Sequence, residues 1–157
     1  MSKTALVAAI ISGGQTGADR GGLDAGIDLG LNIGGYVPKG RRADGDKVPL
    51  YYPMTELNDA GWAPRTRMNV EAADATAIFS PVPTSGGSRF TENECQTQQK
   101  VHRVFDLAKD DATLIVEVRA WLLEVAPRIL NVAGPRERKV PGVEARVRRI
   151  LIAALRG

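Results

Sequence analysis

Apolar runs alternate along the chain with longer stretches that carry an apolar face at helical spacing. The unbroken apolar run at residues 6–11 is typical of a strand buried on both faces, and residues 75–80 carry a similar pattern. Residues 101–107 alternate between apolar and polar positions, which also favours a strand. The predicted strands are residues 6–11, 32–37, 75–80, 101–107 and 128–132. The predicted helices are residues 16–29, 65–73, 89–100, 114–125 and 143–154.

This order of elements predicts the fold class. Strands that alternate with helices form βαβ units, and the strands of such units are parallel. We therefore expect a three-layer, Rossmann-like α/β fold, with a mostly parallel sheet of about five strands and helices on both faces. The chain of 157 residues has the length of one domain, so residues 1–157 are predicted to form a single nucleotide- or cofactor-binding domain.

The first predicted helix carries a pattern that indicates how it packs. Small residues recur every four positions on the first helix, at Ala18, Gly22, Gly26 and Gly30. Each glycine costs a helix about 1 kcal/mol relative to alanine, so we expect this face to approach the sheet closely.

Residues 114–125 fit either a strand or a helix. A helix is favoured because Asp111 or Thr113 would cap its N-terminus.

Composition narrows the class of protein. Hydrophobic residues make up 43% of the chain and charged residues 25%, a balance that excludes a largely disordered protein. The net charge of +3 is too small to indicate a nucleic-acid partner, and no apolar run approaches the roughly 18 residues of a membrane span. With one cysteine, Cys95, and one histidine, His102, there is neither an internal disulfide nor a zinc-binding pattern. We expect a cytoplasmic protein without membrane contact or protein-ligated metal, whose first apolar run is a strand rather than a signal peptide.

The glycine-rich turn after the first strand is the leading candidate for phosphate binding. Residues 12–20 read SGGQTGADR, and they lead into a helix whose N-terminal amides and dipole favour an anion. Asp19 could accept hydrogen bonds from ribose hydroxyls or from a base or pterin edge, and Arg20 could pair with a phosphate. A side chain at Gly14 is expected to fill the phosphate site and to leave the fold intact. The candidate ligand-binding residues of this turn are Gly13, Gly14, Gln15, Thr16, Gly17, Asp19 and Arg20.

Three further loops carry candidate ligand-binding residues. Residues 84–88 repeat a glycine turn before a helix, and residues 131–139 follow the last strand, at the sheet edge where open α/β folds bind ligands. Residues 36–45 supply basic side chains and open a long irregular stretch, residues 38–64, whose length indicates a function. The alternative for each loop is an ordinary turn or a solvated surface loop. The candidates from these loops are Gly86, Gly87, Ser88, Asn131, Gly134, Arg136, Lys39, Arg41 and Arg42.

Five segments together resemble a known family. They are residues 12–20 (SGGQTGADR), 35–42 (GYVPKGRR), 65–69 (RTRMN), 85–88 (SGGS) and 130–142 (LNVAGPRERKVPG). In this order they resemble the molybdenum cofactor carrier family, also described as circularly permuted YpsA-like proteins, a Rossmann-like group related to the lysine-decarboxylase-like phosphoribohydrolases. The resemblance implies that a homo-oligomer, a dimer or tetramer, binds a phosphorylated small molecule. It also implies molybdenum cofactor (molybdopterin) as a ligand, with the metal held by the pterin dithiolene rather than by the protein.

One position on the third predicted helix bears on the choice between carrier and enzyme. In this family and its phosphoribohydrolase relatives, a glutamate follows the second glycine pair, and Asn93 aligns with it here, between Glu92 and Glu94. The first hypothesis is a carrier for molybdenum cofactor or a related phosphorylated pterin or nucleotide. The second is an enzyme that cleaves the N-glycosidic bond of a nucleoside 5′-monophosphate, with Glu94 or Asp19 assisting, and the third is a nucleotide-sensing module. Asn93 favours the carrier, because a neutral amide cannot act as a general base.

Overall fold

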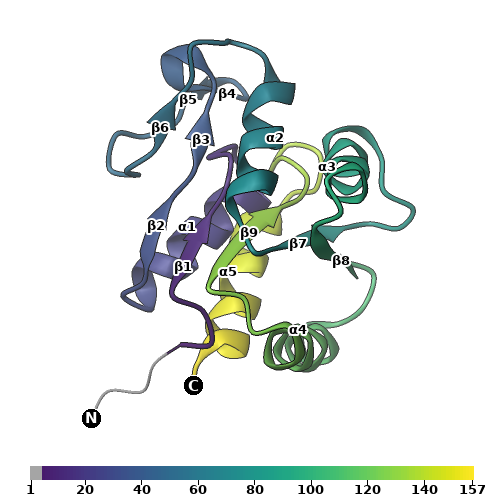
Figure 1. The fold of residues 1–157 in the computed structure, drawn as a ribbon. Coiled ribbons are helices and arrows are strands. Elements are labelled where there is room, and N and C mark those ends of the chain that lie inside the picture. The colour runs from purple at the N-terminus through teal and green to yellow at the C-terminus, as the bar shows by residue number, and fades with distance from the viewer. Residues whose placement is uncertain (1–4) are drawn as a thin grey trace.

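The computed structural model describes residues 5–157, and it places a parallel five-stranded sheet between two layers of helices (Figure 1). The sheet has the order β2-β1-β9-β7-β8. Its strands are β1 (Ala9–Ile11), β2 (Asn32–Gly34), β7 (Ala75–Ser80), β8 (Val101–Asp106) and β9 (Ile129–Ala133). This confirms the predicted three-layer, Rossmann-like α/β fold with helices on both faces of a parallel sheet.

The direction of the strand connections decides which helix covers which face. The chain runs from β1 to β2 toward one edge of the sheet and from β7 to β8 toward the other, so right-handed crossovers place the intervening helices on opposite faces. One layer contains α1 (Ala18–Asp28), α4 (Asp111–Val125) and α5 (Val143–Leu155), with α5 packed against both of its neighbours. The other layer contains α2 (Trp62–Ala72) and α3 (Gly86–Thr97), which contact each other (Figure 1).

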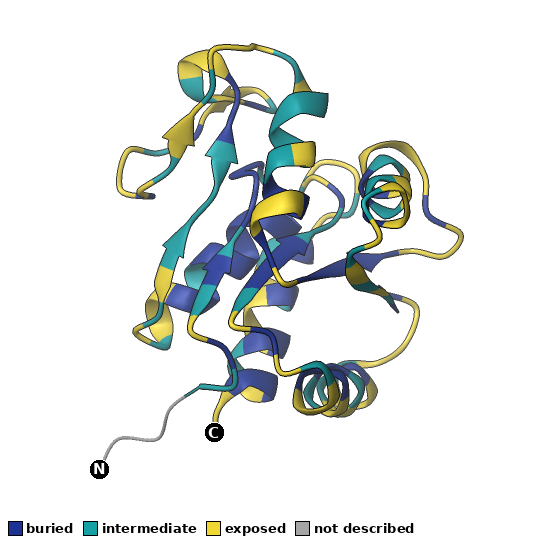
Figure 2. Cartoon of the chain, viewed as in Figure 1, coloured by how far each residue is buried: buried dark blue, intermediate teal, exposed yellow. Residues whose placement is uncertain are grey.

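The larger hydrophobic core lies between the sheet and the α1–α4–α5 layer. Phe79 of β7 stacks on Phe105 of β8, with ring centroids 5.4 Å apart, and Trp121 of α4 meets Phe105 edge-on at 5.6 Å. Figure 2 shows the buried residues concentrated on the sheet and on the helices behind it. Every residue of β7 is buried, as its apolar pattern predicts for a strand covered on both faces.

The ambiguous segment at residues 114–125 is helical, as predicted, but its cap is a different residue. Asp110, not Asp111 or Thr113, is the N-cap of α4, and its carboxylate accepts a hydrogen bond from the amide of Thr113 at 2.8 Å. Asp111 instead forms ion pairs with two arginines of α5, Arg146 and Arg149. The ion pairs with α5 engage Asp111, and the neighbouring Asp110 caps the helix.

Residues 32–61 fold differently from the prediction. The expected strand at residues 32–37 is two strands, because Gly35 adopts a φ of 130° at a point where a side chain would run into the backbone of Ser12. The expected irregular stretch contains a 3-10 turn, η1 (Lys39–Arg41), and short strands. The strand pairs are β3 (Tyr36–Val37) with β6 (Thr55–Glu56), and β4 (Arg42–Ala43) with β5 (Asp46–Lys47).

A small second core supports residues 35–61, which we call the insertion. Leu23 of α1 packs there with four buried residues from the insertion, which are Val37, Ala43, Val48 and Tyr52. The following helix, α2, begins at Trp62 rather than Arg65. Pro64 is tolerated there because it lies in the first turn, where a backbone N–H has no helical acceptor. In residues 5–157 no helix is both long enough and apolar enough to cross a lipid bilayer.

The glycine face of α1 approaches the sheet as closely as predicted. A Cβ atom built on Gly22 would lie 2.7 Å from the Cβ atom of Val132 in β9, and one on Gly26 would overlap Ile33 of β2. Gly30, at the end of this series, instead follows the helix with a φ of 69° and no close neighbour. The contact with the sheet therefore accounts for the two glycines that would otherwise weaken the helix.

Replacing Gly22 with alanine tests this contact. We expect Gly22→Ala to lower the free energy of unfolding by about 1–3 kcal/mol, because overpacking against Val132 outweighs the gain of about 1 kcal/mol in helix propensity. Urea denaturation measures the difference. Gly87→Ala in α3 is the matched control, since a Cβ atom there meets no heavy atom within 4 Å, and it should be neutral or slightly stabilising. A Gly22→Ala protein as stable as the parent would show that the helix can move away from the sheet freely.

Candidate functional site

A cavity of about 490 Å³ opens at the carboxyl ends of β1, β7 and β9. Its walls are the β1–α1 loop, one side of α2, the N-terminal turn of α3 and the β9–α5 loop. Ligands bind at this edge in open α/β sheets, and the volume suits a small molecule. The cavity therefore brings together three of the four loops singled out in the sequence.

The structure divides the predicted site residues into two groups. Those that line the cavity are Gly13, Gln15, Asp19, Gly86, Gly87, Ser88, Asn131, Gly134 and Arg136. Those that do not line it are Gly14, Thr16, Gly17, Arg20, Lys39, Arg41 and Arg42.

The first glycine loop uses its backbone amides within the protein. The amides of residues 14–17 donate hydrogen bonds to side-chain oxygens at 3.0–3.2 Å. The acceptors, in order, are Ser12 Oγ, Asp19 Oδ2, Gln15 Oε1 and Glu144 Oε1. The glutamate comes from α5 and satisfies the amide that precedes α1. The amides of residues 14–17 are therefore already paired within the protein.

Arg20 turns away from the cavity and holds the insertion in place. Its Nε donates to the carbonyl oxygen of Gly14 at 3.0 Å, and its Nη2 forms an ion pair with Asp46 of β5 at 3.1 Å. Arg41 acts in a similar way, because its guanidinium donates to three backbone carbonyls of the loop that follows β5. Both arginines stabilise the insertion next to the first loop.

The second glycine loop keeps its amides available at the cavity wall. Gly86, Gly87 and Ser88 form the first turn of α3, where the helix supplies no acceptor for a backbone N–H. No acceptor in residues 5–157 takes these three amides, and the N-cap residue Ser85 makes no capping hydrogen bond. The Ser85 hydroxyl instead accepts from Lys139 Nζ at 3.1 Å, which places a cationic side chain beside the open amides.

The third loop follows β9 and contributes polar groups of two kinds. Asn131 is buried at the base of the cavity, where its amide nitrogen donates to the Thr76 hydroxyl at 3.3 Å. Arg136 lines the cavity and pairs with Asp44 of the insertion at 3.4 Å. Gly134 lies where a side chain would collide with the carbonyl oxygen of Phe79, so the loop can pass close to β7 only with glycine there.

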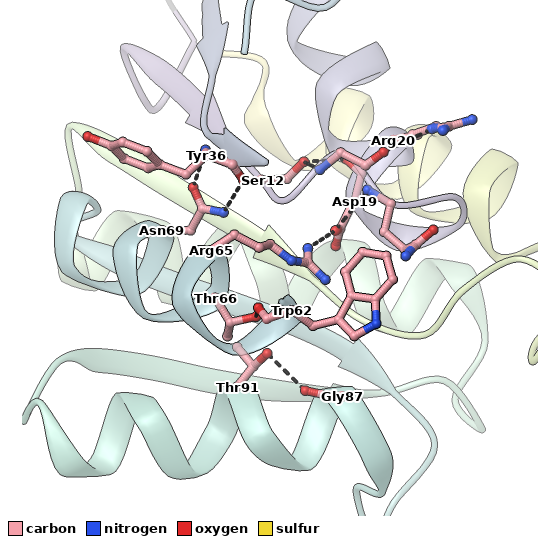
Figure 3. Close-up of polar contacts among 12 residues, drawn as sticks. Ser12, Asp19, Arg20, Tyr36, Trp62, Arg65, Thr66, Asn69, Gly87 and Thr91 are labelled. Carbon is pink, nitrogen blue, oxygen red and sulfur yellow. Dashed lines mark hydrogen bonds and ion pairs between the residues drawn. The ribbon is translucent and has the colours of Figure 1, made fainter. Parts of the chain in front are cut away.

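Asp19 faces Arg65, a cavity residue that was not among the candidates from the sequence. The side chains are 7% and 14% exposed, and Arg65 Nη1 lies 3.2 Å from Asp19 Oδ2 (Figure 3). Burial raises the pKa of the Asp19 carboxyl above its usual value, against the lowering effect of Arg65 and of the Gln15 amide. Arg65 was visible only as the first residue of the RTRMN segment, and no local pattern links it to a loop 46 residues away.

Trp62 lies beside this pair and also lines the cavity. The guanidinium of Arg42 lies 4.5 Å from the centroid of the indole ring and that of Arg65 lies 5.4 Å from it. Arg42 therefore packs on the outside of a cavity residue, while Lys39 stays on the surface. The basic loop supports the cavity wall and does not supply charge to its interior.

The acidic residues of α3 point to other partners. Glu92 accepts a hydrogen bond from the Thr84 hydroxyl at 2.5 Å, and Glu94 pairs with Gln98 and, at 3.7 Å, with Arg67 of α2. Asn93 is exposed, and none of residues 92–94 lines the cavity. Among the described residues, Asp19 is the carboxylate that reaches it. Residues 5–157 also contain no group of three or more side chains arranged to hold a metal ion.

Comparison with known proteins gives one family and one solved structure. The model of the circularly permutated YpsA SLOG family matches residues 10–155. The structure is similar to the crystal structure of a protein named putative molybdenum carrier protein, from Syntrophus aciditrophicus SB. The TM-score is 0.92 and the sequence identity 35%, and the similarity covers 98% of each chain. No curated protein matches the sequence.

Gly14 provides a test of the role of the first loop. Its φ is 70°, and an added Cβ atom would lie 3.0–3.2 Å from methyl groups of Val48 and Val37, away from the cavity. This differs from the expectation that a side chain here would fill a phosphate site and leave the fold intact. We expect Gly14→Ala to lower the free energy of unfolding by about 2–4 kcal/mol, through backbone strain and overpacking of the second core.

The matched control is Gly45→Ala, which has a similar φ of 74° and no heavy atom near the added Cβ atom. It should lose only the strain, about 1–2 kcal/mol. Chemical denaturation of both variants separates the two contributions. Equal losses would show that the contact with Val37 and Val48 contributes nothing.

Proposed function

Because the chain belongs to the circularly permutated YpsA SLOG family, we propose that it binds and carries a phosphorylated small molecule in the cavity between α2 and α3. The observation that carries this proposal is the open first turn of α3, whose amides line the cavity beside Lys139. Converging amides at a helix N-terminus, together with an ammonium group, are the donors that a phosphate accepts. The phosphate would therefore lie against residues 86–88.

The charges on the cavity wall support an anionic ligand. Three cationic side chains line it, Arg65, Arg136 and Lys139, against the single carboxylate of Asp19 in the described part of the chain. The wall therefore carries an excess of positive charge in a partly enclosed space, where electrostatic attraction is stronger than on an open surface. This excess suits a ligand with one phosphate.

The candidate ligands are molybdenum cofactor and related phosphorylated pterins or nucleotides. The name of the similar Syntrophus protein, putative molybdenum carrier protein, supports the first of these. Molybdenum would arrive bound to the pterin dithiolene, so the cavity needs groups for the phosphate and the ring system rather than for the metal. Its amides, cations and neutral polar residues such as Asn69 and Asn131 fit that requirement.

We propose carriage rather than hydrolysis because of where the carboxylates lie. Hydrolysis of an N-glycosidic bond needs a carboxylate placed to activate water or to stabilise charge on the sugar. Glu92 and Glu94 face other partners outside the cavity, and Asp19 is held by Arg65. We also propose that the protein works as a homo-oligomer. Native mass spectrometry of protein purified from its own source would detect the oligomer and any retained small molecule together.

Lys139→Met tests the proposed phosphate site. We expect it to weaken binding of GMP by about tenfold, because the variant loses one charge-assisted hydrogen bond, and to reduce the salt dependence of binding. Isothermal titration calorimetry measures both. Lys109→Met is the matched control, since Lys109 pairs with Glu117 on the surface and does not line the cavity. Equal affinities in the two variants would contradict the assignment.

A turnover assay separates carrier from enzyme. We expect no release of free base from AMP or GMP above background, measured by chromatography after prolonged incubation, while both nucleotides raise the melting temperature. Base release that disappears in Glu94→Gln or in Asp19→Asn would contradict carriage. The variant that abolishes it would identify the carboxylate responsible.

A further inference from the structure

Arg65 has a buried hydrogen-bond donor without an acceptor. Its Nε atom is the one buried side-chain nitrogen or oxygen in residues 5–157 that has no hydrogen-bond partner. Buried donors are paired in almost all native proteins, so this isolated donor, on a residue that lines the cavity, calls for an acceptor that residues 5–157 do not supply. Only Nη1 of the same guanidinium is engaged, by Asp19 Oδ2 at 3.2 Å.

Asp19 offers the complementary group at the same place. Its Oδ2 atom accepts from Arg65 and from the amide of Gln15, whereas no donor in the described residues reaches its Oδ1 atom. Both side chains line the cavity. A donor and an acceptor therefore lie next to each other on one wall, held in place by their own ion pair.

The net charge of this pair decides what it can bind. Asp19 neutralises Arg65, so the pair as a whole favours a neutral polar group over a second phosphate. The unneutralised cation near the first turn of α3 is Lys139, whose partner there is the Ser85 hydroxyl. Figure 3 shows the two regions on opposite sides of Trp62, with Asp19 and Arg65 on one side and Gly87 of α3 on the other. The cavity thus has a phosphate end and a neutral polar end.

We propose that Arg65 and Asp19 form a subsite for a planar heterocycle whose edge presents a hydrogen-bond acceptor next to an N–H donor. Arg65 donates to the ring carbonyl or ring nitrogen, and Asp19 accepts from the adjacent N–H group. The carbonyl–N–H edge shared by guanine and pterins has this pattern, and so does the ring-nitrogen–amino edge of adenine. The inference rests on the proposed function, because the phosphate at residues 86–88 would bring the ring to this wall. Trp62, beside the pair, would contact the ring.

The competing explanation is that the pair only links α2 to the first loop. Such an ion pair would affect folding stability and would treat all ligands alike. A ring subsite would affect only ligands that contain the ring. Ribose 5-phosphate, which has the phosphate and the sugar of a nucleotide but no base, therefore separates the two explanations.

Tryptophan fluorescence can report binding at this subsite. Its two tryptophans are Trp62, on the cavity wall, and Trp121, buried in the main core against Phe105. In a Trp121→Phe background, the remaining indole emission comes from Trp62, 5.4 Å from the Arg65 guanidinium. Quenching of this emission gives the affinity for GMP, AMP, a pterin monophosphate and ribose 5-phosphate.

Three variants in this background test the proposal. We expect Arg65→Met and Asp19→Asn each to weaken binding of at least one ring-containing probe by about tenfold or more, because a charge-assisted hydrogen bond is lost. Binding of ribose 5-phosphate should change by less than about twofold, since its phosphate lies against α3. Arg67→Met is the matched control, because Arg67 also lies on α2 and pairs with a glutamate, Glu94, but does not line the cavity. It should leave every affinity unchanged.

Each outcome decides between the explanations. Equal weakening of GMP binding and ribose 5-phosphate binding by Arg65→Met would place the phosphate at Arg65 and overturn the ring subsite. Unchanged binding of every ring-containing probe would also overturn it. If Arg65→Met does not fold, Asp19→Asn alone decides, because it keeps the size of the side chain and an acceptor for the Gln15 amide. Failure of the proposed function would show separately, as ribose 5-phosphate binding that is insensitive to Lys139→Met. Relative affinities for GMP, AMP and the pterin monophosphate then identify the ring.

Discussion

The close contact between the glycine face of α1 and its neighbours is the constraint on which the cavity depends. Gly22 lies against Val132 of β9, and Gly17, just before the helix, lies against the backbone of the β9–α5 loop. Because no side chain separates these segments, the first loop and the third loop are held next to each other at the edge of the sheet. Glu144 of α5 strengthens this arrangement by accepting from the Gly17 amide. The position of Asp19, one residue into α1, follows from the same contact.

Two glycine turns with similar sequences have different roles in this protein. The first turn pairs the amides of residues 14–17 with side chains from its own loop and from α5. The second turn leaves the amides of residues 86–88 without acceptors in residues 5–157. The difference comes from the neighbours: Ser12, Asp19 and Glu144 lie near the first turn, whereas Ser85 is engaged by Lys139. A glycine turn before a helix creates an anion site only where such acceptors are absent.

The basic residues divide into those that hold the insertion in place and those that line the cavity. Arg20 donates to the carbonyl of Lys47 and Arg41 to that of Pro49, both in the insertion, and Arg42 packs on Trp62. Arg65, Arg136 and Lys139 reach the cavity from α2 and the β9–α5 loop. The insertion thus contributes no residue to the cavity lining, and its ion pairs with Arg20 and Arg136 join it to the first and third loops.

The sequence by itself determined the parallel α/β fold, the helices, the sheet edge that forms the cavity and the family. These features follow from hydrophobic periodicity and from contiguous motifs, which are local properties that each segment carries alone. The tertiary structure alone decided the pairings between distant segments. Examples are the choice of Asp110 as the cap of α4, the short strands of residues 36–56, and the pair of Asp19 with Arg65. Whether an amide, an arginine or a glutamate is available to the cavity depends on which hydrogen-bond or ion-pair partner the fold places beside it. Where that partner comes from another part of the chain, as Arg65 does for Asp19 and Glu144 for the Gly17 amide, no local pattern encodes it.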